Sequence, residues 1–320
     1  MPPPTLQELP TIAAVASQVG RTPDILRQYI NAKASLFEQK LVRKRGTRLR
    51  TRQVYRVHED LKPVHRQIAL WVYQSWEPPD CVHGFLRHRS IATHAAPHCG
   101  QSCVVTADVF DFFPSISRDA VRDALLFLDA TLPVAELLAD LCTLNGFLPP
   151  GTRCSPILAN VAARHLDEDC AALGVPYTRY ADDLAFSGPE EQVPTSAELQ
   201  EALAANGFQL REGSYFCVQQ PRAQYVTGLL VNDAAGPRIP SRVKRRLRQE
   251  VYYVGKHGLE GHCEKTGEPD ALAYLKRVRG RLNQIASVEP SFALGLLADL
   301  PTVPELQGDL SHIDIEPPGE

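Results

Sequence analysis

Four residues, Tyr180-Ala181-Asp182-Asp183, constrain the fold of this 320-residue chain more than any other segment. The two adjacent acids stand between the apolar runs 175–177 and 184–186. Apolar runs on either side of a short polar tip predict a strand, a tight turn and a second strand. Carboxylates at such a tip can bind divalent metal, and two metal ions about 3.5–4 Å apart promote in-line phosphoryl transfer. A solvated acidic hairpin turn is the alternative interpretation.

A third acid lies near the end of a predicted buried strand. Residues 103–109 are mostly apolar and contain Asp108, and Ser117 is a good N-cap for a following helix. A single Asp at a strand end is usually a turn former. Together with Asp182 and Asp183, however, Asp108 supplies the third carboxylate of a two-metal centre, and Mg²⁺ prefers a few carboxylates plus substrate phosphates to an all-protein cage. Because Asp108 is far from the acidic pair in sequence, the two strands must meet through tertiary folding.

Several segments resemble motifs of the reverse transcriptases. Residues 108–116 and 180–183 resemble the first and third palm motifs, and residues 148–156 resemble the glycine loop that positions template and incoming nucleotide. Two further segments, 82–98 and 226–232, resemble blocks that precede and follow the palm in retron enzymes. These blocks follow the family's order, and the resemblance runs from about residue 40 to 295. The chain is therefore identified as similar to the retron-type bacterial reverse transcriptases.

The resemblance implies an α+β fold of the right-hand polymerase type, with fingers, a palm made of an antiparallel sheet with packed helices, and a helical thumb. Helical spacing predicts helices at 11–19, 23–37, 157–173, 195–206, 242–255, 270–286 and 291–300. A hairpin turning at Gly46 is expected at 43–50. The expected parts are an N-terminal helical extension at 1–37, fingers at 38–100, a palm at 101–235 with finger helices at about 117–150, a thumb at 236–300 and a flexible tail at 301–320.

The resemblance also implies an activity, RNA-directed DNA polymerase, and the residues that perform it. Asp108, Asp182 and the Val109 carbonyl would bind two Mg²⁺ ions, with Asp183 as a further catalytic residue and ligand and with Mn²⁺ as an alternative metal. The expected nucleotide-binding residues are Arg50 and Arg43 for the triphosphate, Phe113 beneath the sugar to select deoxynucleotides, and Gly151 for backbone access to the templating pair. Core packing is the alternative role for Phe113, and an ordinary turn is the alternative for Gly151.

The chain departs from the family's pattern at three positions. Pro150 replaces a Gln in the glycine loop, and His94 replaces the Asn of an Asn-Ala-x-x-His block. Ser214 replaces a lysine that is thought to act on the leaving pyrophosphate in related polymerases. Arg211, three residues earlier, is a candidate to compensate for that loss.

Positive charge is clustered although the net charge is −3. Residues 40–56 are rich in Lys and Arg and contain no acid, and further clusters lie at 242–248 and 276–281. Basic residues around an acidic site suit a surface that holds a nucleic-acid duplex, and a solvated helix face is the alternative for any one cluster. The expected RNA-binding residues are Arg242, Lys244, Arg245, Arg246, Arg248, Lys276, Arg277 and Arg279.

The eight cysteines form no Cys-x-x-Cys pair, and several lie in apolar runs, as is typical of reduced core cysteines. A zinc site made of His94, His98, Cys99 and Cys103 is disfavoured because the spacing matches no familiar pattern. The N-terminus lacks the basic start and apolar core of a signal peptide, and no run is long enough to span a membrane. The chain is therefore expected to be cytoplasmic, with no membrane partner.

Similarity to retron enzymes implies several partners. They are a structured non-coding RNA that serves as template and primer with synthesis from a 2′-OH, dNTPs, an RNA–DNA hybrid product, and a separate effector protein in anti-phage defence. One alternative is a defence-associated reverse transcriptase outside the retrons, which the departures at His94, Pro150 and Ser214 favour. A group II intron protein is disfavoured because the chain ends about twenty residues after the predicted thumb. The third alternative is a catalytically inactive polymerase fold that only binds RNA.

Overall fold

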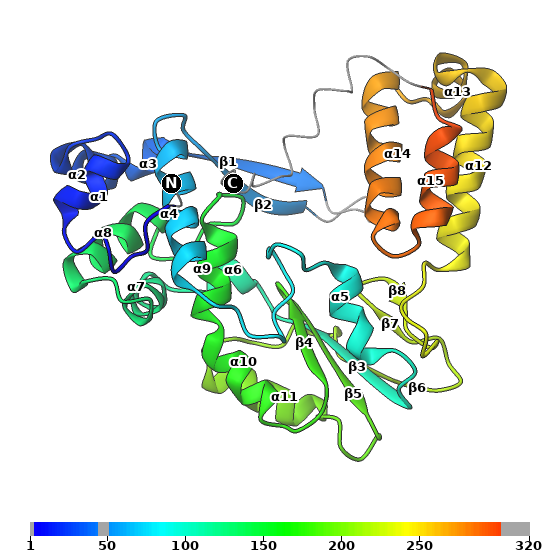
Figure 1. Ribbon diagram of the computed structural model, residues 1–320, viewed down its shortest axis with the longest axis horizontal. Coiled ribbons are helices and arrows are strands. Elements are labelled where there is room, and N and C mark those ends of the chain that lie inside the picture. The colour runs from blue at the N-terminus through cyan, green and yellow to red at the C-terminus, as the bar shows by residue number, and fades with distance from the viewer. Residues whose placement is uncertain (1–2, 44–50, 302–320) are drawn as a thin grey trace.

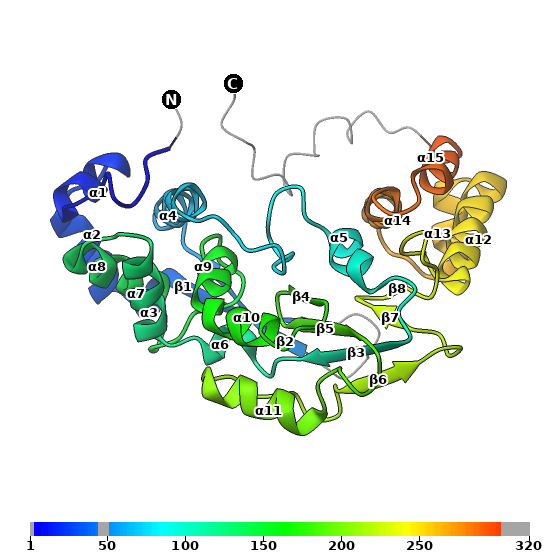
Figure 2. The ribbon, with the colours of Figure 1, turned by 60° about the horizontal axis from the view of Figure 1, so that its bottom comes forward.

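The computed structural model of the protein describes residues 3–43 and 51–301. Figures 1 and 2 both place the N-terminal helices and the C-terminal helices at opposite ends of the molecule, with a central sheet between them. Two apolar cores hold these parts together, and one of them joins the C-terminal helices to the sheet.

The N-terminal part is helical up to residue 36. Its helices are α1 (Ile12–Gln18), α2 (Pro23–Asn31) and α3 (Lys33–Leu36). The hydroxyls of Thr11 and Thr22 accept hydrogen bonds from first-turn N–H groups, which explains where α1 and α2 begin. The prediction of one helix at 23–37 is wrong, because Ala32, with a ψ of 13°, interrupts the helix and Phe37 already belongs to a strand.

A long antiparallel hairpin follows these helices. Strand β1 (Phe37–Arg43) pairs with β2 (Thr51–Val57), so that Arg43 lies opposite Thr51. The turn predicted at Gly46 lies outside the described residues. Helix α4 (Lys62–Ser75) comes next and buries Ile68 and Trp71 in the larger core.

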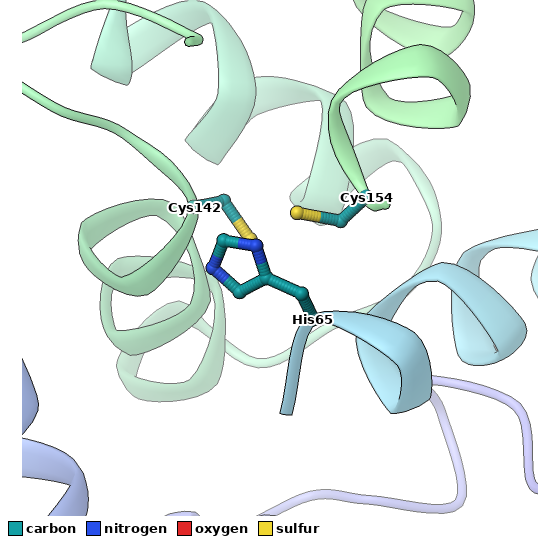
Figure 3. A group of neighbouring side chains, drawn as sticks. All are labelled: His65, Cys142 and Cys154. Atoms are coloured by element: carbon teal, nitrogen blue, oxygen red, sulfur yellow. The ribbon is translucent and has the colours of Figure 1, made fainter. Parts of the chain in front are cut away.

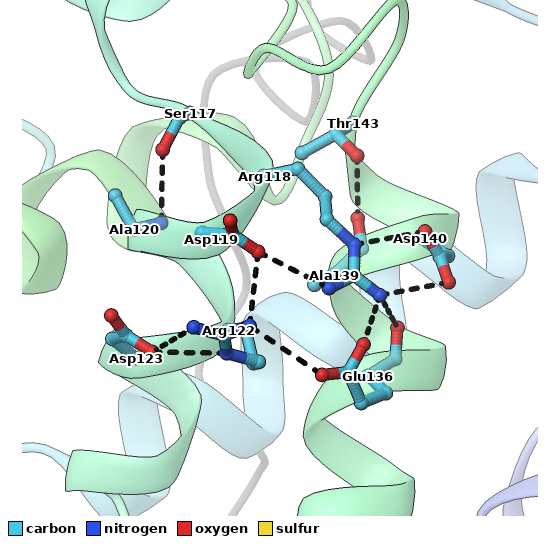
Figure 4. Close-up of polar contacts among 10 residues, drawn as sticks. All are labelled: Ser117, Arg118, Asp119, Ala120, Arg122, Asp123, Glu136, Ala139, Asp140 and Thr143. Carbon is cyan, nitrogen blue, oxygen red and sulfur yellow. Dashed lines mark hydrogen bonds and ion pairs between the residues drawn. The ribbon is translucent and has the colours of Figure 1, made fainter.

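Two packed helices occupy the region predicted at about 117–150. They are α7 (Arg118–Phe127) and α8 (Leu132–Cys142). Arg118 of α7 contacts Glu136 and lies 3.0 Å from Asp140, both on α8, and Arg122 lies 3.6 Å from Glu136 (Figure 4). These ion pairs join two helices whose apolar faces already pack together. Shorter helices, α5 (Ile91–Ala95), η1 (Ala96–His98) and α6 (Phe112–Ser115), flank the first strand of the sheet.

The central sheet is antiparallel, with the strand order β4-β5-β3-β6. Its strands are β3 (Cys103–Asp108), β4 (Tyr177–Tyr180), β5 (Asp183–Gly188) and β6 (Phe216–Gln219). Strand β3 is paired on both sides, and its apolar residues are buried, including Val105 in the larger core and Val104 in the smaller one. This position explains the nearly continuous apolar character of β3.

The single helix predicted at 157–173 is two helices in the structure. They are α9 (Ser155–Ala162) and α10 (Arg164–Ala171), which meet at Ala163, where a ψ of 7° ends the helical geometry. Local sequence gives no sign of this break, because Ala is the strongest helix former. Helix α11 (Ser196–Ala205) begins at the capping box of Thr195 and Glu198, as predicted.

A helical lobe ends the described chain. The hairpin of β7 (Tyr225–Val226) and β8 (Leu229–Leu230) leads into α12 (Ser241–His257), α13 (Leu259–Thr266), α14 (Ala271–Ala286) and α15 (Pro290–Ala298). Helices α12, α14 and α15 match the prediction, and α13 is additional because Gly258, with a φ of +73°, separates it from α12. Leu247 and Leu275 of the lobe share an apolar core with Val104 and Ala185 of the sheet.

The α+β class predicted from the sequence is confirmed. An antiparallel sheet carries packed helices, and a separate helical lobe stands at one end (Figure 1). Across residues 3–43 and 51–301, no helix is both long and apolar enough to cross a membrane.

Candidate active site

The predicted acids lie together at one end of the central sheet. Asp108 ends β3 and Asp183 begins β5, and the two residues are directly paired in the antiparallel register. The Val109 N–H donates to the Asp182 carbonyl at 2.8 Å, which fixes the end of β3 against the acidic turn. The predicted strand, turn and strand are therefore confirmed. The turn is not freely solvated, since the Asp182 side chain is only 21% exposed.

Ala181 gives the acidic turn its shape. Its φ of +58° lies in the left-handed region that residues other than glycine rarely adopt. A neighbouring segment runs alongside, because the Arg179 N–H donates to the Cys81 carbonyl at 2.7 Å and the His83 N–H donates to the Arg179 carbonyl at 2.8 Å. A Cβ added to Gly84 would lie only 2.6 Å from the Ala181 nitrogen. Glycine is thus required where this segment packs on the turn.

A buried ion pair next to the acidic turn supports it through a contact with the backbone of the turn. The Arg179 guanidinium is fully buried and makes two 2.7 Å contacts with the Asp167 carboxylate. It also donates to the Asn160 side-chain oxygen at 3.0 Å and to the Ala181 carbonyl at 3.4 Å. This network was not predicted from the sequence, where its only sign is a charged residue, Arg179, inside the strand expected before the acids.

A guanidinium lies among the acids. Arg211 contacts the Asp108 carboxylate, and its Nη2 lies 3.3 Å from the nearer Asp182 oxygen and 3.2 Å from the Val109 carbonyl. These oxygens are the predicted metal ligands, so the Arg211 guanidinium lies where a bound metal ion is expected. From the sequence, Arg211 was predicted only as a candidate to compensate for the missing lysine, and its contacts with these acids were not predicted.

Ser214 fastens the loop that carries Arg211. Its hydroxyl accepts a hydrogen bond from the Asp108 N–H at 3.0 Å and donates to the Arg211 carbonyl at 2.8 Å. The Arg211 N–H in turn donates to the Asp108 carbonyl at 2.9 Å. The position that holds a lysine in the family pattern therefore serves here to tie the loop to the end of β3.

The surroundings of Asp183 oppose its negative charge. Burial raises the pKa of Asp183 to about 8, and the negative charge of Asp182 and a hydrogen bond with Asp108 act in the same direction. Arg211 opposes this shift. In the absence of a bound cation, these surroundings therefore favour the protonated form of Asp183.

The oxygen donors at this site fit a hard divalent cation. Carboxylates and backbone carbonyls, such as those of Asp108, Asp182, Asp183 and Val109, are the ligand types that Mg²⁺ and Mn²⁺ prefer. The ligand oxygens of the three aspartates do not all lie close to one another. Within the described ranges, the one group of three His, Cys, Asp or Glu side chains whose ligand atoms all lie within 4.8 Å of one another is found elsewhere. The Arg211 guanidinium forms ion pairs with both Asp108 and Asp182.

Aromatic rings lie beside the acidic turn. Phe113 is only 7% exposed, and its ring centroid lies 5.5 Å from Phe112 and 6.1 Å from Phe85. Phe85 is 40% exposed and lies 6.4 Å from Tyr180. Phe85 thus stands between the predicted sugar-selecting residue and the acidic motif, a position that the sequence analysis did not assign to it.

The structure describes some of the other predicted nucleotide-binding residues and leaves others outside the described ranges. Gly151 has a φ of +101°, and a Cβ there would lie 2.9 Å from the Tyr55 carbonyl oxygen. The Tyr55 N–H donates to the Pro150 carbonyl at 2.8 Å, so the glycine loop packs directly on β2. Arg43 is the last residue of β1, and Arg50 lies outside the described residues.

A cavity of about 380 Å³ adjoins the acids. Its lining residues include His94, Asp108, Asp183, Arg211, Ser214 and Thr227. Among the described residues, neither ring nitrogen of the buried His94 nor the Thr227 hydroxyl has a hydrogen-bond partner. Burial, assisted by the charges of His98 and His83, lowers the pKa of His94 to about 2, so this ring is neutral. The departures at His94 and Ser214 therefore face one cavity.

The disfavoured zinc site around His98 is absent among the described residues. The two His98 ring nitrogens lie 2.8 Å from the Ser187 hydroxyl and 2.7 Å from the Thr178 hydroxyl, which leaves neither for a metal. All eight cysteines are free, and five of them are buried. Cys103 and Cys217 come close, with their sulfur atoms 3.1 Å apart on neighbouring strands.

Part of the predicted RNA-binding set is already paired with acids. These pairs are Lys244 with Glu289 at 3.0 Å, Arg246 with Glu250 at 2.9 Å, and Arg277 with Glu268 at 2.5 Å. Pairing reduces the charge that these side chains offer to phosphate.

The remaining members have other environments. Arg242 and Arg248 lie over the rings of Tyr225 and Phe292, at 6.0 and 4.9 Å from their centroids. Arg279 donates to the Pro301 carbonyl at 2.9 Å, whereas Lys276 and Arg245 are exposed. Within the part of the chain that the structure describes, Arg242, Arg245 and Arg248 contact no acid, so they are the most available members of the predicted set on α12.

Comparison with known proteins identifies relatives of the chain, although no family model matches it. The retron Mx65 reverse transcriptase of Myxococcus xanthus is 36% identical over 244 residues, which cover 66% of this chain and 54% of that protein. The retron Ec86 reverse transcriptase of Escherichia coli is 28% identical over 256 residues, covering 78% of this chain and 75% of that protein.

A solved structure of Candida albicans telomerase with a fragment of telomeric RNA has a TM-score of 0.46 and 11% identity, covering 82% of this chain and 58% of that one.

The chain spans about half the length of the Mx65 enzyme and three quarters of the length of the Ec86 enzyme. By sequence, the chain is a relative of the retron reverse transcriptases.

Proposed function

We propose that the protein is an RNA-directed DNA polymerase of the retron type, which copies a structured non-coding RNA into DNA by two-metal nucleotidyl transfer. The observation that carries the proposal is the pairing of Asp108 with Asp183, beside Asp182 and the Val109 carbonyl. Relatives named as retron reverse transcriptases support the same activity. In this proposal, residues 38–100, 101–235 and 236–300 act as fingers, palm and thumb.

The acids would hold the metal ions through Asp108, Asp182, Asp183 and the Val109 carbonyl. When bound, two Mg²⁺ ions, or Mn²⁺ in their place, would activate the attacking hydroxyl and neutralise charge on the triphosphate. Asp183 would lose its proton as positive charge arrives. The buried Arg179–Asp167 pair would keep the acidic turn in position while its charges are rearranged.

Arg211 would change partners during the reaction cycle. Its guanidinium now contacts the Asp108 and Asp182 carboxylates, and positive charge brought to those acids would compete with it. Released from the acids, Arg211 would donate to phosphate oxygens, for which guanidinium is well suited. Arg211 would thereby take the part of the lysine that Ser214 replaces.

The nucleotide would contact residues from three segments. Phe113 would lie beneath the sugar and exclude a 2′-OH, with the exposed Phe85 beside it. Gly151 would give access to the templating pair, and Arg50 with Arg43 would bind the triphosphate. Arg242, Arg245 and Arg248, together with Lys276 and Arg279, would hold phosphates of the RNA–DNA duplex.

The natural RNA partner would serve as both template and primer, and its copying would give a joined RNA–DNA product. The proposal also includes a role in defence with a separate effector, in the cytoplasm.

The copying of a structured RNA into DNA is tested by sequencing the nucleic acid that co-purifies with the wild-type protein. One discrete structured RNA, linked through a 2′-OH to complementary DNA, is the expected result.

Other outcomes of the sequencing separate the alternatives. DNA that matches no linked RNA would indicate a defence-associated polymerase outside the retrons. RNA without any DNA, together with no primer extension, would indicate an inactive RNA-binding protein.

A further inference from the structure

Three potential metal ligands converge inside the protein, away from the acids. His65 lies near the start of α4, Cys142 is the last residue of α8, and Cys154 is the N-cap of α9. Figure 3 shows the three side chains pointing toward one another from these separate helices. Their ligand atoms all lie within 4.8 Å of one another, and each residue is at most 1% exposed. Apolar packing alone gives no reason for an imidazole and two thiols to lie together in a core.

The orientation of His65 leaves one nitrogen free for a metal. Its Nε2 lies 3.0 Å from the Leu141 carbonyl oxygen. A carbonyl can only accept a hydrogen bond, so Nε2 must carry the proton and Nδ1 carries the lone pair. Nδ1 is buried and has no hydrogen-bond partner in the described chain. Metal-binding histidines characteristically donate their other ring N–H to a carbonyl or carboxylate in this way.

The Cys142 and Cys154 thiols are both fully buried, and their sulfur atoms lie within 4.8 Å of each other and of a His65 ring nitrogen. The Thr152 hydroxyl lies 3.5 Å from the Cys154 sulfur and offers a further oxygen at the edge of the cluster.

We propose that His65 Nδ1, Cys142 Sγ and Cys154 Sγ bind one zinc ion, with the Thr152 hydroxyl or a water molecule as the fourth ligand. Two thiolates balance the charge of Zn²⁺, so the occupied site is neutral, as a buried site must be. Both thiol protons leave to solvent on binding. Zinc–ligand distances of about 2.0–2.3 Å require the three side chains to close by about 1 Å or less.

Zinc at this position would act on the structure around the glycine loop. It would join α4, α8 and the start of α9, and Cys154 follows Gly151 by three residues. The glycine loop in turn packs on Tyr55 of β2. The metal would therefore stabilise the junction between the long hairpin and the helices beneath it, and the inference does not depend on the proposed function.

The first test is metal content. Protein expressed with added zinc and purified without chelator should contain one zinc ion per chain. Cys142→Ser and Cys154→Ser should each lose it, whereas Cys263→Ser, which removes a buried thiol in the helical lobe, should retain it. Chelation should lower the melting temperature of the wild type and of Cys263→Ser but not of the two cluster variants.

The second test identifies the ligands. Cobalt(II) added to metal-free protein should produce a thiolate-to-cobalt charge-transfer band in the wild type and in Asp182→Asn, because carboxylate sites give no such band. If the cluster variants fail to fold, X-ray absorption at the zinc edge of the wild type still decides the matter, with two sulfur and one nitrogen neighbours expected. Substoichiometric zinc after dialysis against the metal, or a Cys142–Cys154 disulfide in unreduced protein, would overturn the proposal.

Discussion

At the scale of single residues, the notable feature is a cation held by acids that are expected to bind metal. Arg211 bridges Asp108 and Asp182, and Ser214 ties its loop to the backbone of Asp108. A guanidinium among carboxylates lowers their affinity for another cation, since binding must first displace it. In the proposed mechanism, Arg211 would therefore set the metal requirement of the site.

Arg211→Gln should lower the Mg²⁺ concentration that gives half-maximal DNA synthesis by several-fold. The same change should reduce the rate at saturating Mg²⁺, because the guanidinium would no longer assist the phosphates. Titration of primer-extension rate against Mg²⁺ measures both effects. Arg222→Gln, an exposed arginine outside the site, is the matched control, and an unchanged metal requirement in Arg211→Gln would contradict the assigned role.

Buried histidines make the fold sensitive to acid. Burial is the main cause that lowers the pKa of His83 and His98 to about 4 and that of His94 to about 2, against an ordinary value of 6.5. Below pH 6.5 the unfolded chain protonates these histidines and the folded chain does not, so the stability that they contribute is full above that pH and falls as pH decreases toward 4. For His94 the slope approaches about 1.4 kcal/mol per pH unit.

His94→Asn should therefore make the free energy of unfolding less dependent on pH between 6.5 and 4. Denaturant unfolding at several pH values measures the slope. His88→Asn provides the control, since His88 is exposed and its φ of +59° suits asparagine. Equal slopes in wild type and His94→Asn would refute this assignment.

At the scale of elements, the acidic hairpin depends on a buried pair between β4 and α10. Asp167→Asn would leave the Arg179 guanidinium buried without its counter-charge, which costs about 3–5 kcal/mol in comparable cases. We expect a loss of this order in urea unfolding and a lower rate of DNA synthesis. Glu168→Gln, at the exposed neighbouring position, should leave both nearly unchanged. A fully stable Asp167→Asn would show that the pair does not support the turn.

The sequence predicted those elements whose signals are local. The apolar run of β3, the hairpin around Asp182 and the capping box of α11 are each visible in adjacent residues, and all three are present. The break at Ala163 was not predictable, because no residue there disfavours a helix. Partners from distant segments, such as Asp167 with Arg179 or His65 with Cys154, become neighbours only through tertiary packing.

At the scale of the whole molecule, the helical lobe offers less free positive charge than its composition suggests. Lys244, Arg246 and Arg277 pair with acids, which leaves Arg242, Arg245 and Arg248 as the members of the predicted RNA-binding set on α12 that have no acid partner within the described chain. Charge reversal at those three positions should therefore weaken RNA binding more than reversal at the paired positions.

Arg242→Glu, Arg245→Glu and Arg248→Glu combined should weaken RNA binding and flatten its dependence on salt, since each lost phosphate contact removes about 0.7–0.9 from the logarithmic salt slope. Binding measured from low to high salt tests this. The matched control reverses Lys244, Arg246 and Arg277. Identical salt slopes for the first triple variant and the wild type would mean that α12 presents only a solvated face.

The central claim is that Asp108, Asp182 and Asp183 form a metal-dependent centre for copying RNA into DNA. Its most direct test is primer extension on an RNA template with Mg²⁺, for the wild type, Asp182→Asn and the control Asp129→Asn, which keeps an exposed turn of φ +62°. The account predicts synthesis by the wild type and the control, and none by Asp182→Asn, while that variant binds RNA as the wild type does. Synthesis by Asp182→Asn at the wild-type rate would contradict it.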